Sequence, residues 1–116
     1  MIYFDYSEFD SPDRPGSGRT MNAEFLQMLD AARHIADVPF VITSGVRTLK
    51  WNAKVGGVKG SSHIKGRAAD IACSSSAQRL IIVSALLDVG FRRIGISKTF
   101  IHVDNDPDKL DAIWLY

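Results

Sequence analysis

Two stretches of the chain carry apolar residues at the three- and four-residue spacing of a helix with one buried face. The first runs from about Met21 to Ala36, with Thr20 as the expected N-cap and Pro39 ending the element. Its apolar stripe consists of Phe25, Leu26, Met28, Leu29, Ala32 and Ile35. The second follows the serines at 74–76 and ends near Gly90, where a left-handed cap is expected. The pattern predicts two main helices facing one core.

Short β-branched or alternating runs predict four strands. Their ranges are 40–44, 67–73, 93–96 and 100–104. Alternation places Asp70 on the same strand face as Ala68 and Ala72, and His102 on the same face as Asp104. The Gly-rich segment 45–66 is expected to be a functional surface loop with one helical turn near 51–54. Near the end of the chain, Trp114 and Tyr116 are expected to lie over the core.

Composition limits the classes of function. The 116 residues are 46% apolar and contain no internal repeat or dividing linker, so a single domain over residues 1–116 is expected. The formal net charge of +1 lacks the basic excess of a nucleic-acid-binding protein. No apolar run approaches the roughly 18 residues of a membrane span, and we expect neither a membrane helix nor a signal peptide.

The residues available for a metal site are few. Cys73 is the single cysteine, so a metal would be held by histidine and carboxylate. Of the three histidines, His34 suits a surface or capping role. A charged Asp70 in a half-buried strand needs a partner, and zinc held by His63, Asp70 and His102 would provide one. The alternatives are hydrogen-bonded core histidines and an ion pair of Asp70 with Arg47 or Arg67.

Three segments in this order, TSGVRT, NAKVGGVKGSSHIKGRAADI and FIHVD, resemble the zinc D,D-peptidases of the M15 family. The resemblance is greatest for the small M15 domains of phages and bacterial murein enzymes, and it covers about residues 40–104. It implies an α+β fold in which a small antiparallel sheet packs against two main helices, as in hedgehog and D,D-peptidase domains. It also implies one Zn²⁺ per chain, with His63, Asp70 and His102 as ligands. Arg47 would then bind the peptide and the developing oxyanion, and Ser61 would contact substrate or stabilise its loop.

One position departs from the family pattern. Several branches have a catalytic carboxylate three residues before the third ligand, where this chain has Thr99. Thr cannot act as a general base, and Asp104 is the nearest acid to His102. We therefore expect Asp104 to be the base of a metal-assisted hydrolysis. The alternative is that Asp104 does not touch the metal and instead orients a metal-binding histidine.

The resemblance leads to one expected function and one alternative. The expected function is hydrolysis of D-Ala-containing peptide bonds in the stems or cross-links of peptidoglycan, by a carboxypeptidase or an endopeptidase. Such an enzyme would be a monomer with stem peptides as its partners, made in the cytoplasm and acting on the wall after release, as a phage lysis enzyme does. The alternative is a non-catalytic, zinc-stabilised binding module of hedgehog-like fold.

Overall fold

Helix boundaries in the computed structural model, which describes residues 1–116, follow the side chains that cap them. Helix α1 (Ala23–Ala36) begins after Asn22, whose side chain accepts a hydrogen bond from the Phe25 N–H. The predicted cap Thr20 was wrong, because its hydroxyl donates to the Ser17 carbonyl inside a short 3-10 turn. Helix α3 (Ser76–Asp88) is capped by Ser75, and Gly90 after its end has the expected positive φ of 102°.

Five strands form one sheet in the order β1-β2-β4-β3-β5. They are β1 (Ile42–Ser44), β2 (Ala68–Ala72), β3 (Arg93–Ile96), β4 (Phe100–Asp104) and β5 (Ala112–Leu115). All neighbours are antiparallel except β3 and β5, which run parallel. The α+β class and the four predicted strands are confirmed, whereas β5 was not predicted. A short helix, α2 (Leu49–Lys54), follows β1 near the predicted turn.

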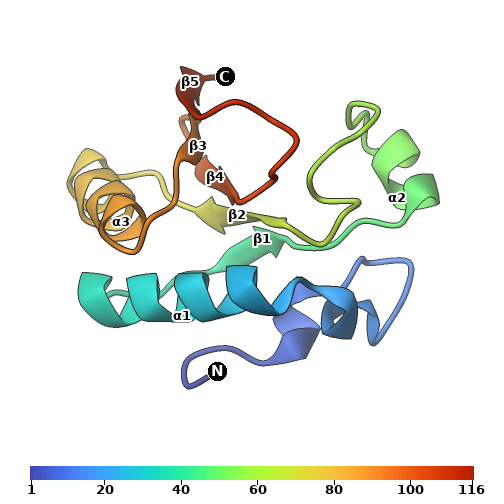
Figure 1. Cartoon of the computed structure of the whole chain (residues 1–116), viewed down its shortest axis with the longest axis horizontal. Helices are drawn as coiled ribbons and strands as arrows, with labels where there is room; N and C mark the ends of the chain where they lie inside the picture. Colours follow the sequence, from blue (N-terminus) through green and yellow to red (C-terminus); the bar gives the residue numbers. More distant parts are fainter.

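The two faces of the sheet differ in polarity. Helices α1 and α3 pack together on one side of it (Figure 1). Their buried residues form a core with the apolar strand face, whose members are Ala69, Ile71, Ile94, Ile101 and Val103. Each large apolar side chain buried there contributes about 1.5–3 kcal/mol relative to an exposed one. The helices thus cover the apolar face, and the opposite face carries Asp70, His102 and Asp104.

Two connections lie beside the polar face of the sheet. One contains α2 and the loop that leads into β2, and the other joins β4 to β5 (Figure 1). The expectation that Trp114 and Tyr116 cover the apolar core was wrong, because strand β5 places both in the lining of a cavity on the polar side. None of the helices is both long and apolar enough to cross a membrane.

Candidate metal centre

A single row of residues across the sheet builds most of the polar site. In the antiparallel register Asp70 of β2 faces His102 of β4, and His102 faces Gly95 of β3. Gly95 is paired in turn with Trp114 of β5. A Cβ at position 95 would lie 2.7 Å from the Trp114 ring, so glycine lets the indole lie across β3 toward the histidine. The ring centroids of His102 and Trp114 are 5.4 Å apart.

His63 reaches the row from the loop before β2. Its Nδ1 donates to the Gly45 carbonyl oxygen at 2.8 Å, and its own carbonyl accepts from the Arg47 N–H. Because Nδ1 is engaged by this carbonyl, Nε2 is the ring nitrogen that faces the cluster, and it lies 3.3 Å from Oδ1 of Asp70. Gly66 helps to set the loop, because its φ of 67° favours glycine and a Cβ there would lie 3.0 Å from the Thr20 carbonyl oxygen.

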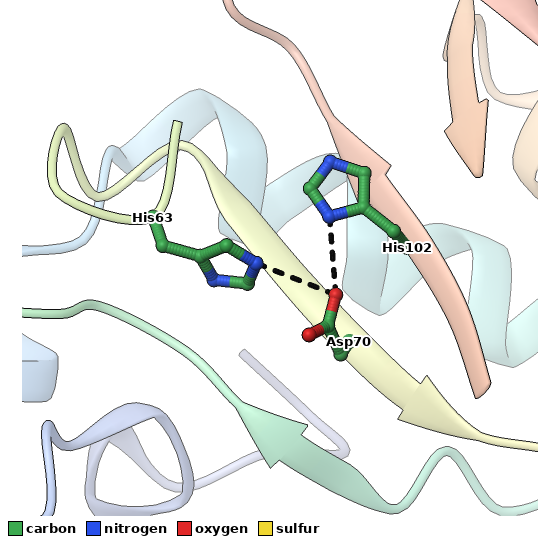
Figure 2. A group of neighbouring side chains, drawn as sticks. All are labelled: His63, Asp70 and His102. Carbon is green, nitrogen blue, oxygen red and sulfur yellow. Dashed lines mark hydrogen bonds and ion pairs between the residues drawn. The ribbon is translucent and has the colours of Figure 1, made fainter. Parts of the chain in front are cut away.

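His63, Asp70 and His102 form one buried cluster, whose side chains converge in Figure 2. Ligand atoms of the three side chains all lie within 4.8 Å of one another. Nδ1 of His102 is 3.1 Å from Oδ1 of Asp70, the oxygen that also faces His63. Two imidazoles and one carboxylate are the donor set of many catalytic zinc sites, so the residues present fit this metal.

The charges in the cluster are mutually stabilised. Burial raises the pKa of Asp70, but hydrogen bonds from His102 and His63 outweigh it and hold this pKa well below its ordinary value. Burial lowers the pKa of His102, and hydrogen bonds to Asp104 and Asp70 more than compensate, so the net shift is upward. Asp70 is therefore an ionised carboxylate, as a metal ligand must be.

Asp104 lies on the opposite side of the His102 ring from Asp70. Its Oδ2 is 2.7 Å from Nε2 of His102. Its Oδ1 accepts from Nε of Arg93 at 2.8 Å and from the Asp106 N–H at 3.1 Å. The Asp104 side chain is 1% exposed, and both of its oxygens have donors. This placement favours the orienting role over the expected role of general base, since the carboxylate contacts the ring edge that points away from the cluster.

Arg47 approaches Asp70 from the residues that follow β1. Its Nη2 is 3.8 Å from Oδ2 of Asp70. Its Nε donates to the Ser44 hydroxyl, and its Nη1 donates to Oδ1 of Asn52 at 3.2 Å. Asn52 is buried and also donates from Nδ2 to the Val58 carbonyl. The guanidinium is thus aimed at the cluster by two neutral side chains.

Asn52 was not identified as a site residue from the sequence. Its contact with Arg47 requires the backbone at Gly57 to pass close to both side chains. A Cβ on Gly57 would lie 2.0 Å from Oδ1 of Asn52 and 3.0 Å from Nη1 of Arg47. In the sequence the glycines at 56–57 indicate only a loop, and the burial of Asn52 beside them is visible only in the structure.

The cluster lies in a cavity of about 420 Å³. Besides the cluster and Arg47, its lining contains Ser61, Arg93, Phe100, Lys109, Trp114 and Tyr116. Asp70 and Asp104 are the only acidic residues in the lining. The Ser61 hydroxyl accepts from the His63 N–H at 3.2 Å, which is the loop-stabilising contact considered for it. The Arg93 guanidinium lies over the Trp114 ring, 4.8 Å from its centre.

Asp106 ties the two loops beside the cavity together. This buried carboxylate accepts from the Ser62 hydroxyl at 2.7 Å and from Nζ of Lys65 at 2.9 Å. Nζ of Lys109 donates to the same Ser62 hydroxyl at 2.9 Å. The loop that carries His63 is therefore anchored to the segment that follows β4.

The remaining candidates lie outside the site. His34 is near the end of α1 and pairs with the Tyr3 hydroxyl. Cys73 is buried in the apolar core, as its strand face predicts. Arg67, one of the two arginines considered as partners of Asp70, instead donates to Asn105.

Comparison with known proteins agrees with this geometry. No curated protein matches the chain. The family model described as Peptidase M15 matches residues 3–104, which includes all three residues of the cluster, Arg47 and Asp104. The chain belongs to the peptidase M15 family of metallopeptidases.

Proposed function

We propose that this protein is a zinc-dependent peptidoglycan peptidase that hydrolyses peptide bonds next to D-Ala in stem or cross-link peptides. The observation that carries the proposal is the convergence of His63, Asp70 and His102 in a cavity that also contains the Arg47 guanidinium, in a chain of this family. The three clustered residues would hold one Zn²⁺. When bound, the metal supplies Lewis acidity that polarises a peptide carbonyl and lowers the pKa of water.

The role of Arg47 in this proposal is to bind substrate oxygen. Ser44 and Asn52 fix the guanidinium, and its 3.8 Å separation from Asp70 leaves donor capacity for a carbonyl or carboxylate oxygen. Such a charge-assisted hydrogen bond is worth about 1.5–3 kcal/mol when shielded from water. Arg47 would thereby orient the peptide and stabilise negative charge that develops on its carbonyl oxygen.

In this proposal Asp104 orients His102, and the Gly45 carbonyl orients His63. The Gly45 carbonyl holds the proton of His63 on Nδ1, and Asp104 holds the proton of His102 on Nε2. Each contact directs the other ring nitrogen toward Asp70, where it would donate to the carboxylate in the absence of metal and would bind the metal through its lone pair when zinc is present. Asp104 is a positioning residue under this assignment.

Mass spectrometry of purified muropeptides, before and after incubation with the zinc-loaded protein, tests the proposal. A carboxypeptidase removes one terminal D-Ala, and an endopeptidase splits cross-linked dimers into monomers. We expect one of these changes, and we expect the His102→Ala variant to produce neither. Intact muropeptides after incubation with folded protein that contains one zinc per chain would contradict the proposed activity.

One observation favours the alternative of a non-catalytic, zinc-stabilised binding module. The only carboxylates in the cavity lining are Asp70 and Asp104, and donors contact both, so no free acid is available as a proton acceptor. For such a module, zinc would raise the melting temperature while leaving every muropeptide intact. Measuring thermal stability and muropeptide masses on the same preparation separates the two functions.

A further inference from the structure

A second cavity, of about 700 Å³, has Arg47 in its lining but none of the three residues of the cluster. Arg47 is the one residue that lines both cavities, so the two are neighbours at this residue. The lining of the second cavity comes from three segments: the loop and 3-10 turn at 14–20, residues 46–50 and Ile64. A peptide that extends from the cluster past Arg47 would enter this space.

The lining of the second cavity is basic. It contains Arg14, Arg47 and Lys50 and no acidic residue. The side chains of Arg14 and Lys50 are exposed, and neither forms an ion pair. Other exposed cations such as Lys59 and Lys98 also lack an ion pair, so Arg14 and Lys50 are distinguished by lining the same cavity. Two unpaired cations thus flank one cavity.

Asp13, next to Arg14 in the sequence, interacts electrostatically with Lys50 but forms no ion pair with either cation. Asp13 is absent from the cavity lining, and its carboxylate accepts hydrogen bonds from the hydroxyls of Ser11 and Thr48. Apolar surface from Val46, Leu49 and Ile64 lies in the same cavity, beside the cations. Aliphatic surface next to unpaired positive charge is complementary to an acidic amino-acid side chain, whose methylenes end in a carboxylate.

We infer that the cavity between Arg14 and Lys50 is a substrate subsite that binds a carboxylate-bearing residue of the peptide. This inference rests on the proposed function, because it takes a peptide as the ligand. It assigns specificity to residues outside the metal cluster. The enzyme would favour peptides with a free carboxylate at this position over the same peptides with an amide there.

The test uses the full chain and two fluorescent stem-type peptides that are identical except for glutamate or glutamine at one position. Fluorescence anisotropy of the metal-free protein measures the Kd of each peptide, and the zinc-loaded protein gives kcat and KM. Wild type should bind the glutamate peptide more tightly. Arg14→Gln and Lys50→Gln should each reduce that preference about two- to fivefold, the range for a solvent-exposed charge pair. The reduction should appear in Kd and KM, with kcat unchanged.

Lys98→Gln is the matched control. Lys98 is also an exposed cation without an ion pair, but it lies in the turn between β3 and β4 and lines neither cavity. The control should keep the full preference for the glutamate peptide. Equal binding of the two peptides by wild type, or an equal loss in Lys98→Gln, would overturn the inference. A preference in anisotropy without hydrolysis of either peptide would support the subsite while contradicting the proposed peptidase activity.

Discussion

Asp104 holds the His102 ring at 2.7 Å, from the side opposite Asp70. The two residues lie two positions apart on β4, so the strand itself brings both side chains to the same face of the sheet. Arg93, the cross-strand partner of Asp104, holds the other carboxylate oxygen. His102 is thus oriented by a buried charge that is itself fixed by an ion pair.

The first prediction concerns Asp104→Ala. We expect this variant to bind zinc about ten- to a hundredfold more weakly, because the His102 ring loses the acceptor that fixes its proton and direction. Turnover of a D-Ala-terminated peptide should recover as zinc is added. If Asp104 were the general base, the variant would keep its zinc affinity and lose about two to four orders of magnitude in rate, without rescue by metal.

The second prediction concerns the three proposed ligands. We expect wild type to contain one zinc per chain and His102→Ala to lose stoichiometric binding. His34→Ala is the matched control, since His34 lies outside the cluster on α1, and this variant should keep its zinc. Elemental analysis of protein purified without chelators measures both. Stoichiometric zinc of unchanged affinity in His102→Ala would show that the third ligand is assigned incorrectly.

The third prediction separates substrate binding from metal binding at Arg47. Arg47→Lys should keep zinc and lower kcat/KM about ten- to a hundredfold, because an ammonium lacks the planar set of donors that Ser44 and Asn52 position. Arg67→Lys is the control, since Arg67 is half-buried but contacts Asn105. If Arg47→Lys unfolds while activity per folded molecule stays normal, the role of Arg47 is structural.

The sequence pattern predicted the part of the site that depends on alternation within strands. The bounds predicted for β3 and β4 match the structure, and alternation placed Asp70 and His102 on polar strand faces. These positions are predictable because a buried strand repeats every two residues. Packing of the alternate residues Ile101 and Val103 in the apolar core then fixes which face is polar.

Contacts between distant segments could not be predicted in the same way. Strand β5 is mostly exposed and pairs only with β3, so its sequence carries no clear pattern of burial. Missing this strand misplaced Trp114. The direction of the Asp104 carboxylate depends on Arg93, and the tautomer of His63 depends on Gly45, 18 positions earlier. Such pairings depend on the sheet register and on loop paths, which single-sequence periodicity does not specify.

The fourth prediction is that Asp106→Asn destabilises the protein by about 1–3 kcal/mol at neutral pH, the range for a buried group that loses a charged partner. Burial raises the pKa of Asp106, but hydrogen bonds from Lys65 and Ser62 outweigh it, so the folded pKa lies below the unfolded one. The stabilisation is therefore complete above the unfolded pKa and declines as pH falls toward the folded value.

Urea unfolding at pH 7 and near pH 3 measures this effect. The difference between wild type and Asp106→Asn should be smaller at the acidic pH. Asp108→Asn is the control, because Asp108 also contacts Lys65 but its side chain is 76% exposed, and its effect should stay within about 0.5 kcal/mol. A gap between wild type and Asp106→Asn that widens at low pH would contradict the assigned direction of the pKa shift.

The last prediction is that Trp114 reports metal binding through its fluorescence. Its ring lies 5.4 Å from the ring of His102, with the Arg93 guanidinium also against it. Co²⁺ suits the same imidazole and carboxylate ligands as zinc, and its d-electron transitions quench a nearby indole. Titration of the metal-free protein with Co²⁺ should therefore quench emission with one site per chain.

Trp51→Phe should keep the quenching, because Trp51 lies on α2 and lines no part of the cavity. Trp114→Phe should abolish it while still binding Co²⁺ by elemental analysis. Quenching that persists in Trp114→Phe would place the bound metal away from His102 and contradict the assigned cluster.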